Sequence, residues 1–193
     1  MIIGVLAIQG AFLKHQEVLR KLGIQSTLVK HPADLSGING LIIPGGESTT
    51  MTKILRSEKW SDDAEQFART HPVFGTCAGA IMLSSSESHK VNPWHIIDME
   101  ISRNAFGRQI HSFITEIETE NGMRQEKFPA VFIRAPRITS IGDQVQVLGR
   151  YKGEPVLVRQ GSALAATFHP ELTDATDIHQ YFIEEICSRA KAA

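Results

Sequence analysis

A cysteine between small residues is the first position in this chain whose side chain suits covalent chemistry. Cys77 is central in residues 75–79, Gly-Thr-Cys-Ala-Gly, which follow an apolar stretch at 72–74 and precede one at 80–83 that can form a helix. The pattern Gly-x-Cys-x-Gly between a strand and a helix predicts a nucleophile elbow, a sharp turn that presents the cysteine at the tip of a sheet. The positive end of the helix dipole would favour the thiolate over the thiol. The alternative is a buried, inert cysteine within an α/β core.

A nucleophilic thiol needs a base, and His169 is the candidate. It lies in residues 168–171, Phe-His-Pro-Glu, at the end of the apolar segment 164–168. If the chain stays extended through Pro170, His169 and Glu171 project from the same side, so that the carboxylate can reach an imidazole nitrogen. Cys77, His169 and Glu171 then form a triad of nucleophile, base and orienting acid. Taken alone, His-Pro-Glu also fits a polar loop after a strand.

Acyl transfer also needs hydrogen-bond donors for the developing oxyanion. The backbone N–H of Ala78, the residue after the nucleophile, is the expected first donor. Gly45 and Gly46 follow another predicted strand and are expected to supply the second, because glycine lets the backbone approach closely. Alternatively, the two glycines form a plain turn, and residues 47–49 cap the helix that begins near residue 50. Capping and substrate binding are compatible for this segment.

The elements that must position these residues alternate between strands and helices in the first half of the chain. Strands are predicted at 2–8, 26–30, 41–43 and 72–74, and helices at 12–22, from 51 and at 62–70. Strands predicted at 113–120, 130–134, 145–148 and 156–159 then follow one another, before a core strand at 164–168 and a closing helix at 178–190. This order predicts a three-layer α/β fold, with a mostly parallel central sheet, helices on both faces and an antiparallel strand extension. Chemistry is expected beyond the carboxyl ends of the parallel strands.

Length and charge restrict the class of protein. A chain of 193 residues, 42% of them hydrophobic, predicts a single domain over residues 1–193 with one sizeable core. The 20 basic and 21 acidic residues give a net charge of −1 without a long run of one sign, which argues against a nucleic-acid or membrane-surface partner. The apolar residues 1–10 have neither a basic region nor a cleavage site, so they predict a buried strand rather than a signal peptide. We therefore expect a soluble, cytoplasmic protein.

The second cysteine and the remaining histidines show no pattern that indicates a site. Two cysteines give neither a disulfide framework nor zinc-ligand spacing, and Cys187 is expected to pack within the final helix. The other histidines share no metal-ligand spacing, and each is expected to be a surface or structural residue: His15, His31, His71, His89, His95, His111 and His179.

Three segments together carry a family resemblance. They read Gly-Thr-Cys-Ala-Gly at 75–79, Pro-Gly-Gly-Glu-Ser-Thr-Thr at 44–50 and Phe-His-Pro-Glu-Leu-Thr at 168–173, and together they resemble the class I, triad-type glutamine amidotransferases. Stretches at 4–11, 103–109 and 131–136 narrow the resemblance to the glutaminase subunits of pyridoxal 5′-phosphate synthases. The similarity runs along essentially the whole chain.

The resemblance implies hydrolysis of L-glutamine to glutamate and ammonia. It implies that Cys77 forms a glutamyl thioester, and that His169 protonates the departing ammonia and then activates water while Glu171 orients its ring. A cation near the substrate carboxylate and acceptors near its ammonium make physical sense for an amino-acid site. The alternative for the arginines of this site is a surface or interface salt bridge. The family's glutamine-binding positions fall on Gly46, Glu47, Ser48, Arg103, Ile133 and Arg134.

The resemblance also implies a partner. Family members pass ammonia to a synthase subunit, which combines it with a pentose phosphate and a triose phosphate, and glutaminase subunits decorate a dodecameric synthase core. Docking reorders the oxyanion loop, here Gly45 and Gly46. The glutaminase step needs no cofactor and no metal, and pyridoxal phosphate is a product of the complex rather than a group held by this chain.

The chain departs from the family pattern after Thr173. An acid and then an arginine two residues later are usual there, and Ala175 and Asp177 take those places, which concerns helix-entry or partner contacts rather than the triad. Three other interpretations stay open: the glutaminase of another synthase, such as imidazole glycerol phosphate synthase, a catalytically silent regulatory subunit, and a cysteine peptidase or stress protein. The stretches at 103–109 and 132–136 argue against the first, the intact triad against the second and the glutamine-site motifs against the third.

Overall fold

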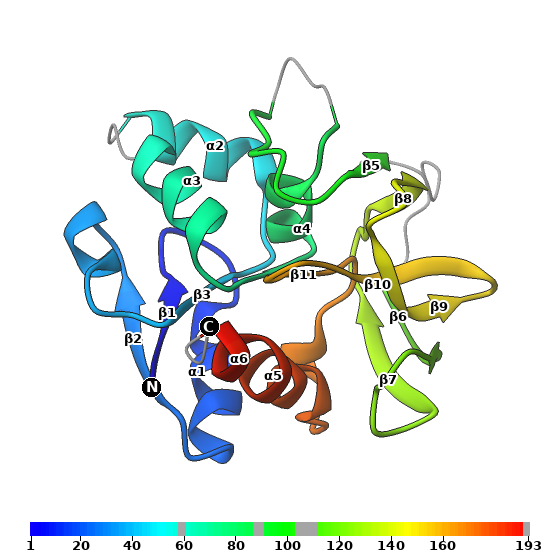
Figure 1. The fold of residues 1–193 in the computed structure, drawn as a ribbon. Helices are drawn as coiled ribbons and strands as arrows, with labels where there is room; N and C mark the ends of the chain where they lie inside the picture. The colour runs from blue at the N-terminus through cyan, green and yellow to red at the C-terminus, as the bar shows by residue number, and fades with distance from the viewer. Residues whose placement is uncertain (58–60, 87–90, 103–111, 191–193) are drawn as a thin grey trace.

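The computed structural model describes residues 1–57, 61–86, 91–102 and 112–190 (Figure 1). Within these residues the strands form one nine-stranded sheet, in the order β2-β1-β3-β4-β11-β10-β9-β6-β7, and a two-stranded sheet of β5 and β8. Neighbours from β2 to β11 pair in parallel, and neighbours from β11 to β7 pair antiparallel. The predicted α/β class, with its antiparallel extension of a parallel sheet, is confirmed.

The predicted strands and helices occur in the predicted order along the chain. The strands are β1 Ile2–Leu6, β2 Gln25–Val29, β3 Gly40–Ile43, β4 Val73–Thr76, β5 Met99–Ser102, β6 Phe113–Thr119, β7 Lys127–Phe132, β8 Arg137–Ile141, β9 Gln146–Tyr151, β10 Glu154–Gln160 and β11 Ala163–Ala166. The helices are α1 Phe12–Lys21, α2 Ser48–Ser57, α3 Ser61–Thr70, α4 Ala78–Leu83, α5 Asp177–Tyr181 and α6 Ser188–Ala190. Short helical turns are η1 Pro32–Leu35, η2 Pro170–Leu172 and the π-helical η3 Phe182–Cys187.

Helices cover both faces of the parallel half of the sheet. Strands β3, β4 and β11 are buried at every residue, which explains their continuous apolar sequence. Helices α2, α3 and α4 pack on one face, and α1, α5 and α6 on the other (Figure 1). Each face has its own apolar cluster, the first including Met51 and Phe67 and the second including Leu19 and Phe182. These layers fix the carboxyl ends of the parallel strands at one rim.

The antiparallel half brings β7 close to that rim. Phe128 and Phe132 of β7 pack against Phe168, with ring centroids 6.3 and 5.5 Å away. The backbone N–H of His169 donates to the carbonyl of Val131 at 2.8 Å, so the loop after β11 is tied to β7. The end of β7 therefore lies beside the end of β11, although β7 is at the sheet's far edge in pairing order.

Sequence periodicity missed or misplaced some elements. Strands β5 and β8 were not predicted, because β5 has four residues and β8 is exposed at four of its five positions, which leaves little apolar pattern. Helix α2 begins at Ser48, earlier than the predicted start at residue 51. The closing helix runs through the π-helical turn η3, which the sequence pattern does not reveal.

Among the described residues, no helix is both long enough and apolar enough to pass through a membrane.

Candidate active site

Cys77 occupies a sharp turn between β4 and α4. Its backbone has φ 47° and ψ −101°, a conformation that side-chain-bearing residues adopt only when the surrounding structure holds them there. The Cys77 N–H donates to the carbonyl of Ala166 at 2.8 Å and anchors the turn to β11. A Cβ on Gly79 would lie 2.0 Å from the carbonyl oxygen of Ile43, so α4 can pack this closely on β3 only with glycine at that position. The flanking glycine thus serves the elbow through close packing.

His169 and Glu171 meet, but the chain between them is not extended. The Nδ1 atom of His169 lies 2.7 Å from Oε1 of Glu171. Pro170 to Leu172 forms the 3₁₀ turn η2, so the predicted extended path through Pro170 is wrong and the turn itself brings the two side chains together. Both residues are buried, with exposed fractions of 7% for His169 and 3% for Glu171.

Electrostatics favour a protonated His169 beside an ionised Glu171. Burial lowers the pKa of His169, but hydrogen bonds and charge attraction from Cys77 and Glu171 outweigh burial and raise the pKa from 6.5 to about 10. Burial raises the pKa of Glu171, but His15 and His169 outweigh it and hold that pKa below its usual 4.5. A protonated imidazole next to a thiol favours the thiolate–imidazolium pair that a cysteine nucleophile requires.

Two backbone segments border the nucleophile as oxyanion donors were expected to do. Ala78 is the first residue of α4, so its N–H has no acceptor within the helix. The N–H of Gly45 donates to Oγ1 of Thr76 at 3.0 Å, so in this geometry it is not directed at an oxyanion. A Cβ on Gly45 would lie 2.3 Å from Cε1 of His169, so the loop lies directly against the imidazole ring.

Glu47 caps helix α2, as the capping interpretation expected of it, whereas Ser48 and Thr49 lie within the helix. Its carboxylate accepts the N–H groups of Thr49 and Thr50 at 3.0 and 2.8 Å and the hydroxyl of Thr50. The Thr50 hydroxyl and these N–H groups lower the pKa of Glu47 to about 2. The Gln9 side chain holds the Glu47 backbone through both its amide atoms, each at 3.1 Å. Gln9 lies in the quoted stretch 4–11, but no role was predicted for it.

A cavity of about 610 Å³ joins most of the predicted site residues. Glu171 lies behind the imidazole rather than on the cavity wall, and Ser48 is buried at the start of α2. The prediction for Arg103 falls outside the described residues. Lining residues that sequence reasoning did not single out are Gly10, Ala11, Ser112 and Leu172. The predicted residues that line the cavity are Gly45, Gly46, Glu47, Cys77, Ile133, Arg134 and His169.

Ile133 and Arg134 enter the site from the loop after β7. The carbonyl oxygen of Ile133 lies 3.9 Å from Sγ of Cys77. Arg134 has φ 44°, a further strained backbone beside the cavity. The Ile133 carbonyl thus lies near the Cys77 sulfur, and both Ile133 and Arg134 line the cavity.

Comparison with known proteins assigns the family. The profile of the SNO glutamine amidotransferase family matches residues 5–188. The chain belongs to this family. It is 46% identical over 181 residues to the pyridoxal 5′-phosphate synthase subunit PdxT of Francisella philomiragia, which covers 94% of this chain and 97% of that protein. It is 45% identical over 188 residues to PdxT of Thermotoga neapolitana, covering 96% of this chain and 100% of that protein.

Solved structures agree with this assignment. A crystal structure of a glutamine amidotransferase is 41% identical and superimposes with a TM-score of 0.88, covering 97% of this chain and 100% of that one. The structure of PurLQS from Thermotoga maritima, 15% identical, has a TM-score of 0.70 over 95% of this chain and 98% of the matched one. The second likeness shows that the fold is shared at low identity.

Two further residues considered in the sequence, Cys187 and Asp177, lie in contacts that stabilise the fold. Cys187 is 1% exposed, and burial raises the pKa of its thiol to about 12, as expected for a packed cysteine. Asp177, at a position where the family pattern differs, begins α5 and accepts a hydrogen bond from Gln125 at 2.8 Å. Within the described residues, no group of three or more His, Cys, Asp or Glu side chains could hold a metal ion.

Proposed function

We propose that this chain is the glutaminase subunit of a pyridoxal 5′-phosphate synthase. It hydrolyses L-glutamine to L-glutamate and ammonia and delivers the ammonia to a partner synthase subunit. Membership of a glutamine amidotransferase family and near-full-length similarity to PdxT subunits support this function. The observation that carries the chemistry is that His169 contacts Glu171 and lines one cavity with Cys77.

The first half of the reaction forms a thioester. Cys77 acts as a thiolate beside the His169 imidazolium and attacks the side-chain amide carbon of glutamine, so that a C–S bond forms and the carbonyl oxygen becomes an oxyanion. The N–H groups of Ala78 and the Gly45–Gly46 loop stabilise that oxyanion. His169 then protonates the amide nitrogen, the C–N bond breaks and ammonia leaves. Glu171 keeps the imidazole in the orientation and tautomer that these transfers need.

The second half regenerates the enzyme. Neutral His169 removes a proton from water, the hydroxide attacks the thioester carbon, and the C–S bond breaks to release glutamate and the Cys77 thiolate. The raised pKa of His169 keeps its imidazolium form in place between turnovers. No cofactor or metal takes part in these steps.

The cavity supplies groups for the amino-acid end of glutamine. The guanidinium group of Arg134, which lines the cavity, binds the α-carboxylate. The family resemblance assigns the same role to Arg103. The Glu47 carboxylate and the Ile133 carbonyl accept from the α-ammonium, while Gly46 lines the wall and Ser48, buried at the start of α2, supports the segment that carries Glu47. Glu47 stays ionised in this role because its pKa is lowered to about 2.

The partner completes the oxyanion site. In this structure the Gly45 N–H donates to Thr76. Following the family resemblance, docking of the synthase subunit turns the Gly45–Gly46 loop into its active arrangement. Residues 1–193 act as one glutaminase domain, and several copies decorate a dodecameric synthase core in the cytoplasm. The continuous sheet through both halves of the chain supports the single domain.

The test is glutamate release from L-glutamine by the purified chain, alone and with a pyridoxal 5′-phosphate synthase subunit. We expect strong stimulation by the partner, and pyridoxal phosphate when the pentose and triose phosphates are added. Cys77→Ala should abolish glutamate release, while the matched control Cys187→Ala retains it. Full activity without the partner, or none with it, would point to another amidotransferase or to a regulatory subunit.

A further inference from the structure

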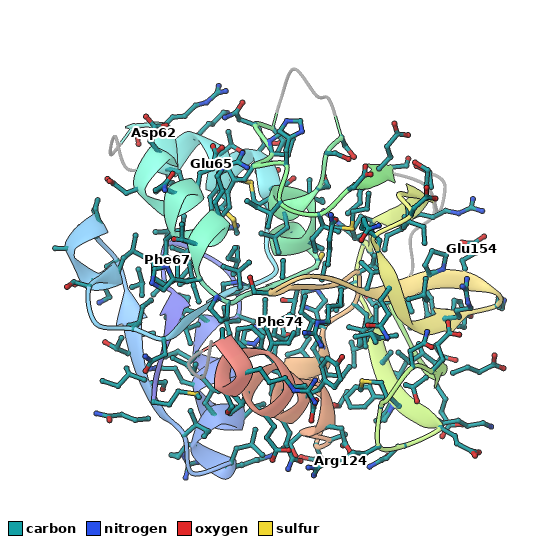
Figure 2. All side chains as sticks on the ribbon, in the orientation of Figure 1. Asp62, Glu65, Phe67, Phe74, Arg124 and Glu154 are labelled. Carbon is teal, nitrogen blue, oxygen red and sulfur yellow. The ribbon has the colours of Figure 1, made fainter. Side chains whose placement is uncertain are left out.

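Two histidines outside the triad are completely buried behind Glu171. His15 of α1 and His179 of α5 both have an exposed fraction of 0%. The Nδ1 atom of His15 lies 2.9 Å from Nε2 of His179, although 164 positions separate the two residues. Both rings meet Phe74 edge-on, with centroids 6.4 and 5.5 Å away, and Figure 2 labels Phe74 at the centre of the molecule near α5. The proposed hydrolytic steps use neither histidine.

The second carboxylate oxygen of Glu171 points toward this pair. Oε1 is occupied by His169, whereas Oε2 is buried and has no conventional hydrogen bond within the described residues. Its polar neighbour is Nε2 of His15 at 3.5 Å. A buried carboxylate oxygen without a donor is costly. The backbone N–H of Glu171 interacts with this carboxylate, and an N–H at Nε2 of His15 adds a second donor group on the side of Oε2.

A count of protons gives one consistent set of tautomers. Burial lowers the pKa of His15, against the attraction of Glu171, and lowers the pKa of His179 to about 3, so burial favours the neutral form of both rings. With its proton on Nε2, His15 directs an N–H toward Oε2 of Glu171 and Oγ1 of Thr76, and it accepts at Nδ1 from the Nε2–H of His179. The Nδ1 atom of His179, which has no partner within the described residues, is then a bare acceptor. The opposite tautomers would place a lone pair against Oε2 and leave a buried N–H unpaired at His179.

His15 also contacts the residue before the nucleophile. Its Nε2 lies 3.4 Å from Oγ1 of Thr76, and that hydroxyl oxygen accepts the N–H of Gly45 at 3.0 Å. The same imidazole nitrogen therefore lies between the triad carboxylate and the hydroxyl that holds the oxyanion loop. His15 therefore contacts both the triad carboxylate, Glu171, and the hydroxyl of Thr76 that binds the Gly45 loop.

We infer that His15 is a positioning residue for this glutaminase site: its Nε2–H, fixed by the hydrogen bond between His15 and His179, holds Glu171 so that Oε1 faces His169. The inference rests on the proposed function for its kinetic consequences. The orientation of Glu171 also controls how strongly His169 stabilises the Cys77 thiolate, which can be measured without glutamine. A core histidine that only fills space would have neither effect.

The test compares two amide replacements of His15. Glutamine places its amide nitrogen near the position of Nε2, whereas asparagine places its nitrogen near Nδ1, and both keep a polar group in the core. We expect His15→Asn to lower kcat for glutamate release about 10- to 100-fold with an unchanged KM, because small misplacements of a catalytic group have effects of this size. His15→Gln should recover most of kcat.

The second readout is the pH dependence of iodoacetamide alkylation at Cys77. In His15→Asn the midpoint should rise by about one pH unit, because a poorly held Glu171 stabilises the His169 imidazolium less. In His15→Gln it should stay near the wild-type value. The matched control is Leu19→Ala on the same helix, which removes a fully buried side chain outside these contacts and should lower stability without moving the midpoint.

The outcomes separate the two proposals. If His15→Asn and His15→Gln have the wild-type kcat and alkylation midpoint, the inference is overturned. The same holds if Leu19→Ala, at equal loss of melting temperature, shifts the midpoint as far as His15→Asn. If the wild-type chain hydrolyses no glutamine even with a synthase subunit, the proposed function fails, while the alkylation midpoints still decide whether His15 positions Glu171.

Discussion

Nδ1 of His169 lies 2.7 Å from Oε1 of Glu171 across a 3₁₀ turn that contains Pro170. The turn has few alternatives because proline fixes its own φ and the His169 N–H is held by Val131. Local backbone geometry therefore places the proposed base, His169, beside its proposed orienting acid, Glu171, and the proposed nucleophile, Cys77, follows a different strand. Variants of these residues can therefore distinguish an effect on the orientation of the His169 ring from an effect on glutamine binding.

Replacement of the orienting acid should affect the rate and leave binding unchanged. In Glu171→Gln the amide no longer stabilises the imidazolium or fixes its tautomer, so kcat should fall about 10²- to 10⁴-fold with little change in KM. Steady-state glutamate release with the synthase subunit measures both constants. Glu184→Gln, which removes an exposed carboxylate paired with Arg124, is the matched control and should match the wild type. An unchanged kcat in Glu171→Gln would remove its orienting role.

The raised pKa of His169 predicts how stability depends on pH. The native state keeps the proton up to about pH 10, whereas the unfolded chain releases it near 6.5. The contribution of His169 is therefore complete below pH 6.5 and is lost as pH rises from 6.5 through 10. Urea unfolding between about pH 6 and 10 should show a steeper loss for the wild type than for His169→Gln. If the free energy of unfolding changed with pH in the same way for the wild type and His169→Gln, the raised pKa of His169 would be contradicted.

The two cysteines should differ in reactivity toward iodoacetamide at neutral pH. Cys77 lines the cavity beside His169, while Cys187 is 1% exposed with a pKa raised to about 12 by burial. Peptide mass spectrometry should locate the label on Cys77 alone. The Cys187→Ala chain should be labelled as the wild type is, and the Cys77→Ala chain should remain unlabelled. Equal labelling of both positions would mean that the thiol environments do not differ as described.

Sequence reasoning was most informative within short segments. The turn at Cys77 and the contact between His169 and Glu171 each lie within five residues, so the spacing indicated which side chains are neighbours. The same reasoning placed the parallel strands, since their continuous apolar runs reflect burial on both faces. It gave the wrong path through Pro170, because the extended and 3₁₀ conformations both suit a proline.

Contacts between distant segments could not be predicted in this way. His15 and His179 show no spacing pattern, and only the packing of α1 and α5 on one face of the sheet brings them together. Gln9 likewise reaches Glu47 across 38 positions. Strand β8 was missed because its exposed residues have no apolar alternation, and its pairing with β5 depends on the fold of intervening segments.

A single methyl group on the oxyanion loop should impair catalysis. In Gly45→Ala the new Cβ would lie 2.3 Å from Cε1 of His169 and 3.2 Å from Cβ of Cys77, so the loop or the imidazole must shift. A shift of about 1 Å in a catalytic group can lower kcat about 100-fold.

Gly161→Ala is the matched control for Gly45→Ala. Its φ of 56° makes alanine strained, yet no atom lies within 4 Å of the added Cβ, and the residue is at the opposite end of β11 from His169. This variant should lose about 1 kcal/mol of stability and keep kcat. Glutamate release and thermal melting of both variants measure the difference. If Gly45→Ala kept the wild-type kcat, the loop would accommodate a methyl group without displacing His169. The proposal that this loop binds the oxyanion would then be contradicted.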